Sequence, residues 1–261
     1  MAVFRARAVA VAAGVPAVFA VLAGLLSIAT PATLATAAEP AVAPAAGPAA
    51  TDSVAFFVTR DLVRSASPPM NVTFRKGTTD PVAFITIDDG VTKDRRGLRY
   101  VEQTKLPVTA FVSAWTVKDR APYFTRITRW GSVQNHSATH ASLARSSTDL
   151  DHEICYTQRA LAKDFGSSPW MMRPPYGAGY DRQLAQVTAE RCGISEFVMW
   201  DAVVEDGRLT RAGKGLRPGS IILLHFTPNL EKDLKVAVRA ARRAGLTPAN
   251  LAEYLPAPTS G

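Results

Sequence analysis

The stretch VAFITIDDG occupies residues 82–90 and sets the pattern for the rest of the chain. Positions 82 to 87 are apolar apart from one threonine, which is typical of a strand buried on both faces of a parallel sheet. Asp88 and Asp89 end this strand, and Gly90 permits a tight turn after it. Active sites of parallel sheets and barrels lie at the carboxyl ends of the strands. The two aspartates are therefore candidate catalytic groups, although Asp-Asp-Gly is also a common turn sequence.

Short apolar runs continue to alternate with helical stretches after this strand. Further strands are predicted at 108–113, 170–173, 197–200 and 220–224, and helices at 95–104, 123–130, 149–165, 181–191 and 230–244. This alternation indicates βα units that build a mostly parallel sheet. We expect an α/β fold, a closed or nearly closed, TIM-like (β/α) barrel of about seven strands. An open doubly wound sheet is the alternative.

The N-terminal part of the chain has a different composition. After Arg5 and Arg7 no charged residue occurs up to position 38, and residues 9–29 are apolar apart from one serine. Residues 1–38 are predicted to be a signal peptide or, if uncleaved, a membrane anchor. Residues 39–53 form an Ala/Pro-rich linker. We therefore expect one domain over 54–261 in a secreted, extracytoplasmic protein that is associated with the cell wall or with a membrane.

Composition excludes several classes of protein. The 261 residues include 30 Lys+Arg and 22 Asp+Glu, a formal net charge of +8, and 47% hydrophobic residues. This is enough apolar material for a sizeable core, and it excludes a wholly disordered or fibrous chain. The basic residues are spread along the sequence and form no dense stripe, so no nucleic-acid partner is expected. Attraction to an anionic wall or membrane surface fits the charge better, and a merely solvated basic surface is the simplest interpretation. We expect a monomer.

Two histidines form a second candidate site in the segment NHSATH. His136 and His140 are four residues apart, so in a helix their imidazoles would lie on one face and would be able to share a metal ion. With one aspartate they make a set of two histidines and one carboxylate, which suits zinc and also non-haem iron. The alternative is a structural role for both histidines.

Two further groups lie at or near predicted strand ends. In RPPYG (173–177) two prolines fix an extended backbone, so Arg173 is held in a rigid loop. An arginine next to Asp88 would favour the ionised carboxylate. His225 follows the apolar run IILL, and a partly desolvated histidine at a strand end is a candidate general acid. A connecting turn and a structural histidine are the respective alternatives.

Taken in order, four motifs carry a resemblance to a known family. They are TIDDG (86–90), HSATH (136–140), RPPYG (173–177) and ILLH (222–225). Together they resemble the motifs of the polysaccharide deacetylases, the family 4 carbohydrate esterases that share the NodB homology domain. The resemblance spans about residues 82–225. It implies a distorted (β/α) barrel and identifies 54–261 as a NodB-type domain.

The resemblance also implies a role for each matching residue. Asp88 corresponds to the general base of the family and His225 to its general acid. The other implied roles are metal ligand for Asp89, His136 and His140, orientation of the base for Arg173, oxyanion binding for the backbone N–H of Tyr176, and lining of the substrate groove for Pro175, Leu223 and Trp200. The cofactor so implied is a divalent metal, most often Zn²⁺.

One family motif is only partly present. The family carries a DxxDW motif whose second aspartate tunes the acid histidine and whose tryptophan walls the acetyl groove. Here Asp206 retains the tuning position, whereas Val203 and Gly207 replace the first aspartate and the tryptophan. We therefore expect a groove that is more open on this side, or walled by another residue, with a greater consequence for specificity than for activity.

The implied function is metal-dependent removal of N-acetyl groups from an N-acetylglucosamine-type polymer. Peptidoglycan, chitin oligomers and acetylated xylan are the candidate substrates. The alternatives are an O-acetyl esterase acting on xylan or a wall polymer, and a catalytically weak carbohydrate-binding relative. Adjacent carboxylates such as Asp88 and Asp89 do not flank a sugar bond at the separation that glycosidases need, which argues against glycoside hydrolysis.

The two cysteines form a candidate disulfide. Cys155 lies on one predicted helix, and Cys192 lies just past the end of the next. Neighbouring helices outside a barrel bring such residues together, and export permits oxidation. We expect a disulfide, with two buried thiols as the alternative.

Overall fold

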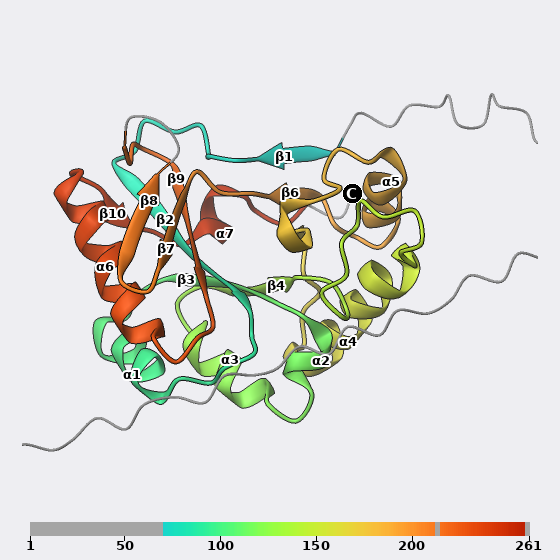
Figure 1. The fold of residues 1–261 in the computed structure, drawn as a ribbon, viewed down its shortest axis with the longest axis horizontal. Helices are drawn as coiled ribbons and strands as arrows, with labels where there is room; N and C mark the ends of the chain where they lie inside the picture. The colour runs from blue at the N-terminus through green and yellow to red at the C-terminus, as the bar shows by residue number, and fades with distance from the viewer. Residues whose placement is uncertain (1–69, 212–214, 259–261) are drawn as a thin grey trace, which may run out of the picture. The chain divides into compact units, whose positions relative to one another are not determined.

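One curved sheet organises the part of the chain that the computed structural model describes, residues 70–211 and 215–258. Its strands follow the order β1-β6-β5-β4-β3-β2-β9-β7-β8, and β10 pairs with the start of β2 (Figure 1). All pairings are parallel except the β7–β8 hairpin. The strands are β1 (Asn71–Thr73), β2 (Val82–Asp89), β3 (Val108–Val112), β4 (Ser132–Asn135), β5 (Met171–Met172), β6 (Glu196–Val198), β7 (Ala202–Glu205), β8 (Arg208–Arg211), β9 (Ser220–His225) and β10 (Thr247–Pro248).

The segment after β1 links the two sides of this sheet. β1 itself pairs with β6, and Arg75 then forms an antiparallel bridge with Ser220 at the start of β9. The Lys76 N–H donates to the carbonyl of Gly219 at 3.0 Å. The strands between β6 and β9 therefore curl into a distorted barrel, and the predicted fold class is confirmed.

Most helices cover the outside of the barrel, and they are largely where the sequence predicts them. They are α1 (Arg95–Thr104), α2 (Ala114–Val117), α3 (Ala121–Ile127), the π-helix η2 (Asp151–Tyr156), α4 (Thr157–Phe165), the short η3 (Pro175–Gly177), α5 (Gln183–Arg191), α6 (Leu230–Arg243) and α7 (Leu251–Tyr254). The predicted helix 95–104 has the same bounds as α1, which begins where the Asp94 carboxylate accepts the N–H groups of Arg96 and Gly97 at 3.0 Å. The helix predicted over 149–165 instead begins as a π-helical turn and continues as α4.

The strands separate an outer core from a barrel interior. On β2, Ile85 and Ile87 pack outward against helices α1, α3 and α6, whereas Phe84 and Asp88 lie on the opposite face, because successive strand residues alternate. In the interior, Phe84 belongs to an apolar cluster that includes Leu251 of α7. One end of the barrel is thus filled with apolar side chains, and the carboxyl ends of the strands carry the polar ones.

The sequence prediction contains no strand at β1, β4, β7, β8 or β10, and the reason is clearest for β4 and for the β7–β8 hairpin. β4 has the sequence SVQN, in which alternation is too short and too polar to stand out. The hairpin of β7 and β8 turns at Asp206 and Gly207, both with positive φ, 51° and 76°. An Asp-Gly pair is a strong hairpin signal, and it identifies this turn in retrospect.

The N-terminal predictions concern a part of the chain that is not described. The expected signal peptide at 1–38, the linker at 39–53 and the beginning of the domain at 54 all lie outside the described residues. Within 70–211 and 215–258, no helix has the length and hydrophobicity needed to cross a bilayer.

Candidate active site

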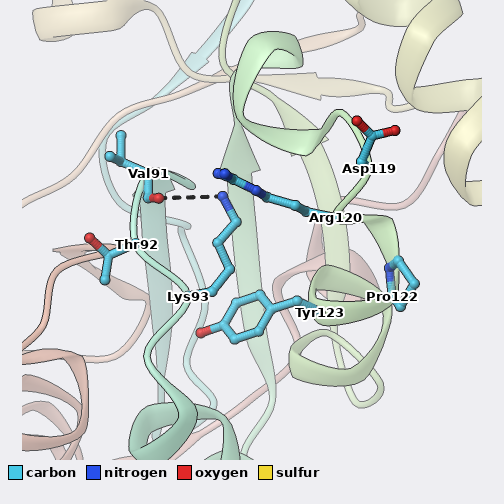
Figure 2. A pocket seen from close by; sticks show the side chains of 7 residues that line it. All are labelled: Val91, Thr92, Lys93, Asp119, Arg120, Pro122 and Tyr123. Atoms are coloured by element: carbon cyan, nitrogen blue, oxygen red, sulfur yellow. Dashed lines mark hydrogen bonds between the residues drawn. The ribbon is translucent and has the colours of Figure 1, made fainter.

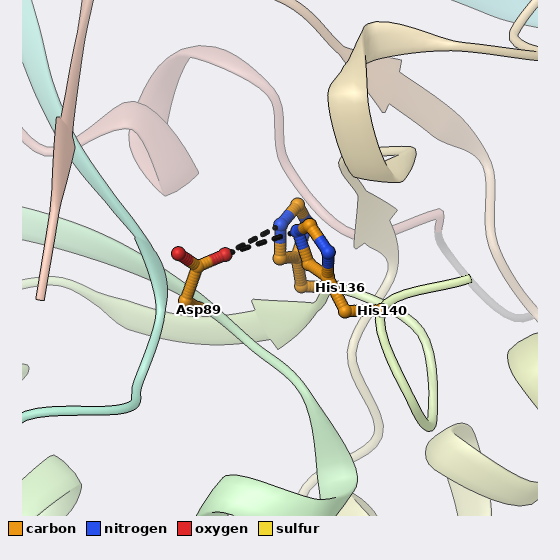
Figure 3. A group of neighbouring side chains, drawn as sticks. All are labelled: Asp89, His136 and His140. Atoms are coloured by element: carbon orange, nitrogen blue, oxygen red, sulfur yellow. Dashed lines mark ion pairs between the residues drawn. The ribbon is translucent and has the colours of Figure 1, made fainter. Parts of the chain in front are cut away.

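Three side chains converge at the carboxyl ends of β2 and β4. Asp89 ends β2, and His136 and His140 lie in the loop that follows β4 (Figure 3). Oδ1 of Asp89 is 3.3 Å from Nε2 of His136 and 3.1 Å from Nε2 of His140. The three ligand atoms all lie within 4.8 Å of one another. The structure therefore brings together the whole set of metal ligands that the sequence predicts.

Hydrogen bonding orients these atoms as a metal site requires. Nδ1 of His136 is 2.7 Å from the carbonyl oxygen of Arg173. A carbonyl can only accept, so Nδ1 donates its proton, and the lone pair of the neutral ring lies on Nε2, toward Asp89. Oδ1 of Asp89 is buried and accepts no hydrogen bond from the described residues. A buried carboxylate oxygen facing imidazole lone pairs is costly unless a cation lies between them, so the residues fit a divalent metal with two nitrogen ligands and one oxygen ligand.

The same contacts shift the protonation of the site. Burial alone would raise the pKa of the Asp89 carboxyl. When His136 and His140 face it with N–H groups instead of lone pairs, their hydrogen bonds outweigh burial and hold this pKa well below its usual range. The contact with Asp89 raises the pKa of His140, against the opposing effect of burial. Asp89 is therefore an ionised carboxylate at neutral pH, as a metal ligand must be.

The loop that carries the histidines is not helical, so a helix is the wrong explanation for their pairing. Ser137 and His140 have φ values of 67° and 65°, which interrupt any helix. Local side-chain bonds shape the loop instead. Oδ1 of Asn135 accepts the Ser137 N–H at 2.8 Å, and Oγ of Ser137 accepts the His140 N–H at 3.0 Å.

Glu153 braces this loop from the π-helix η2. Its buried carboxylate accepts the N–H of Thr139 at 2.9 Å and the hydroxyl of Thr139 at 2.7 Å. Thr139 directly precedes the ligand His140, so Glu153 fixes the backbone between the two histidines. The sequence carries no signal for this role, because a glutamate on a predicted helix is usually solvated.

The second aspartate of the pair is held by a buried arginine. Oδ1 of Asp88 accepts from Nη1 of Arg173 at 2.7 Å, and Arg173 is fully buried. The other guanidinium nitrogens donate to backbone carbonyls of Val198 and Met199, each at 2.9 Å. Oδ2 of Asp88 lies 3.9 Å from Nε2 of His136. Arg173 thus orients Asp88 with one oxygen bound and the other facing the metal ligands.

His225 lies at the same level as Asp88 on the neighbouring strand. These two residues are register partners in the parallel pairing of β2 with β9. Leu223 is two residues earlier on the same face, opposite Thr86. Among the described residues the His225 imidazole forms no hydrogen bond. The predicted base and acid are therefore brought together across one strand pair.

The RPPYG loop places Tyr176 over the metal ligands. Pro175 is buried, and Tyr176 has a φ of 61° and an exposed fraction of 72%. The Tyr176 ring centroid is 4.6 Å from that of His140, and its N–H has no backbone acceptor among the described residues. Trp200 is half-buried, lies against Gly177 of the loop, and its ring is 5.5 Å from the Arg173 guanidinium, so it supports the loop.

The predicted tuning residue Asp206 has a different partner. It lies exposed on the β7–β8 turn, where its Oδ1 accepts from Nδ2 of Asn229 at 3.0 Å. No hydrogen bond or ion pair joins Asp206 to His225. At the next position, the flexible end of the Lys232 side chain lies where a side chain at Gly207 would project. The groove side that lacks the family tryptophan is thus formed by a tight turn docked on α6.

The two cysteines are paired in the structure. A disulfide joins Cys155 of η2 to Cys192 at the end of α5, with the Cα atoms 5.3 Å apart. Glu153 lies two residues before Cys155, so this link tethers the same π-helix that braces the histidine loop.

Comparison with known proteins places this architecture in a family. The profile of the family described as polysaccharide deacetylase matches residues 75–196. An uncharacterised protein of Streptomyces coelicolor is 34% identical over 191 residues, covering 68% of this chain and 74% of that protein. A chitooligosaccharide deacetylase of Sinorhizobium fredii is 30% identical over 162 residues, covering 58% of this chain and 74% of that protein. The chain belongs to the polysaccharide deacetylase family.

A further relative and two solved structures extend this comparison. A peptidoglycan-N-acetylglucosamine deacetylase of Bacillus cereus is 29% identical and covers 55% of each chain. A family 4 carbohydrate esterase from Bacillus anthracis shares the fold with a TM-score of 0.59 at 22% identity, covering 79% of this chain and 95% of that chain. A pseudoenzyme of the same family from Bacillus anthracis shares it with a TM-score of 0.58 at 20% identity, covering 74% and 71%.

Proposed function

We propose that this polysaccharide deacetylase is exported, depends on a divalent metal and removes N-acetyl groups from an N-acetylglucosamine-type polymer. The observation that carries the proposal is the buried Oδ1 of Asp89, which accepts no hydrogen bond from the described residues and lies 3.3 and 3.1 Å from two imidazole nitrogens, next to a carboxylate held by Arg173. The names of two relatives, deacetylases of chitooligosaccharide and of peptidoglycan N-acetylglucosamine, support this substrate class. Export to the wall or beyond rests on the sequence of residues 1–38.

Asp89, His136 and His140 would hold the metal, and zinc fits this donor set best. When bound, a divalent ion supplies Lewis acidity, which makes a water molecule easier to deprotonate and stabilises negative charge on a carbonyl oxygen. The protein residues around it determine where the proton and the negative charge go.

Asp88 supplies the general base. Its Oδ1 is occupied by Arg173, so its Oδ2, which faces the metal ligands, takes the proton of the attacking water. Attack on the acetyl carbon converts the carbonyl oxygen into an oxyanion. The N–H of Tyr176 is free to donate to that oxygen.

His225 supplies the general acid. It lies level with Asp88 and donates a proton to the nitrogen as the C–N bond breaks, which leaves acetate and a free amine. An amine is a poor leaving group and needs this proton more than an alkoxide does. A positioned acid therefore supports amide cleavage as the activity and O-acetyl ester cleavage as the second candidate.

Acetate release tests the proposal. The full chain is stripped of metal, reloaded with zinc, and assayed on N-acetylglucosamine oligomers, peptidoglycan and acetylated xylan. Zinc should restore release, and Asp88→Asn should lower kcat by at least about 100-fold. Asp164→Asn, an equivalent change at an exposed position, is the matched control and should retain wild-type activity.

Two results would contradict the proposal. Release from acetylated xylan alone would identify an O-acetyl esterase. Stoichiometric zinc binding with no acetate from any polymer, together with sugar affinity that survives Asp88→Asn, would identify a binding protein.

A further inference from the structure

A hollow of about 680 Å³ opens beside the loop that follows Asp89 (Figure 2). Two of its lining residues are cations, and neither forms an ion pair with a carboxylate in the described part of the chain. The lining residues are Val91, Thr92, Lys93, Asp119, Arg120, Pro122 and Tyr123.

Lys93 is fixed in this hollow by backbone carbonyls. Its ammonium donates to the carbonyls of Gly90 at 2.5 Å and Thr116 at 2.9 Å, with a longer contact of 3.4 Å to Val91. These three acceptors occupy its three protons, and the Phe124 ring lies 5.2 Å away, but no carboxylate of the described residues neutralises the charge. Gly90 directly follows the metal ligand Asp89, so the hollow and the metal site share one backbone turn.

Arg120 brings a second positive charge to the same place. Its side chain is exposed and extends across the hollow toward the Lys93 nitrogen (Figure 2), and its guanidinium has no acceptor among the described residues. Burial, together with this neighbouring charge, lowers the pKa of Lys93 to about 8. Asp119 lies at the far side with its carboxylate directed away from Lys93 (Figure 2). Two cations are thus held together without a protein anion between them.

We propose that this hollow is a subsite for a carboxylate-bearing sugar next to the acetylated one. A guanidinium presents a planar pair of donors that matches a carboxylate, and Lys93 adds its field at close range. The proposal rests on the proposed function and narrows its substrate to an acidic glycan. The carboxylate has two chemical sources, a lactyl ether on a hexosamine or a uronic acid.

Four substrates and three variants test this subsite. The substrates are N-acetylglucosamine oligomers, oligomers in which alternate sugars carry a lactyl ether, the same oligomers with the carboxyl groups amidated, and oligomers that alternate with glucuronic acid. The variants are Arg120→Gln, Arg120→Lys and Arg239→Gln, the last being the same change at an exposed position of α6.

The measured quantity is the ratio of kcat/KM on a charged oligomer to that on the neutral one. Arg120→Gln should lower this ratio about fivefold, as expected for one partly exposed ion pair. Arg120→Lys should restore part of it, Arg239→Gln should leave it unchanged, and the amidated oligomer should behave as neutral. The charged oligomer with the higher ratio, lactyl ether or glucuronic acid, identifies the source of the carboxylate. An unchanged ratio in Arg120→Gln, or an equal loss on the amidated oligomer, would overturn the subsite.

Affinity measurements test the subsite independently of the deacetylase activity. Dissociation constants are measured by calorimetry on zinc-loaded Asp88→Asn, with and without Arg120→Gln. If wild-type protein releases no acetate, the proposed function fails, but tighter binding of the charged oligomers that depends on Arg120 still supports the subsite. Equal affinity for charged and neutral oligomers would exclude it.

Discussion

The two sides of the site are built in different ways. On the metal side, at β2, β4 and β5, the active groups are joined to buried partners: Asp88 to Arg173, His136 to the Arg173 carbonyl, and the histidine loop to Glu153. On the acid side, at β7, β8 and β9, the His225 imidazole has no hydrogen-bond partner among the described residues. Asp206 lies exposed on the hairpin turn.

This difference follows from what each side must do. Three ligands can hold one ion only if their positions are fixed within a fraction of an ångström, which needs locked rotamers and buried hydrogen bonds. A general acid needs only to come within hydrogen-bond reach of the leaving group once substrate is bound. Changes on the metal side should therefore cost far more than changes on the acid side.

The largest effect is expected at Arg173. Arg173→Met leaves the buried Asp88 carboxylate without its partner, so the free energy of unfolding should fall by about 3–5 kcal/mol. Urea denaturation measures this change. Arg191→Met removes an exposed ion pair with Asp151 and should cost less than about 1 kcal/mol. Equal costs for the two variants would remove the contrast between buried and exposed pairing.

A substitution at Glu153 tests the metal side without altering a metal ligand. Glu153→Gln replaces a charged acceptor of two Thr139 bonds, so zinc affinity should fall about tenfold. Competition with a chromophoric chelator measures the affinity of the metal-free protein. Glu253→Gln, at an exposed position of α7, is the control. Unchanged affinity in Glu153→Gln would show that the loop holds its geometry without this brace.

The pH dependence of zinc affinity tests how closely the ligands on the metal side are coupled. The pKa of His140 is raised by Asp89, and a protonated imidazole cannot bind metal. Zinc affinity should therefore fall as the pH drops through this raised pKa, by about tenfold for each pH unit below it. The fall should begin at a higher pH than for an ordinary histidine. Titration of the affinity across neutral pH measures this, and a fall confined to pH values below the usual histidine pKa would contradict it.

Gly207 gives the smallest expected effect, on the acid side. Its φ of 76° is strained for any residue with a side chain, and the flexible end of Lys232 would have to move aside, so Gly207→Trp should lower the free energy of unfolding by about 1–2 kcal/mol. It should also give no gain in acetate release. Gly207→Asn, which tolerates this φ better, is the control for backbone strain. A more active Gly207→Trp would show that the missing groove wall limits catalysis.

Much of the barrel is predictable because strand and helix signals are local. The apolar run before Asp88 predicts β2, and the periodicity of 95–104 predicts α1 with its bounds. β4 escapes prediction because its four residues are held by pairing with β3 and not by their own pattern. The loop with His136 and His140 is likewise set by side-chain bonds that no spacing rule contains.

The order of strands, helices and four motifs in the sequence is sufficient to assign the barrel, the family and the candidate ligands. Folding alone establishes which groups meet. The resemblance implies that Arg173 orients Asp88, but the sequence does not predict that Glu153 braces Thr139 or that Asp206 bonds Asn229 and not His225. The physical reason is range: backbone propensity and periodicity act over a few residues, whereas these bonds depend on how distant strands and helices pack.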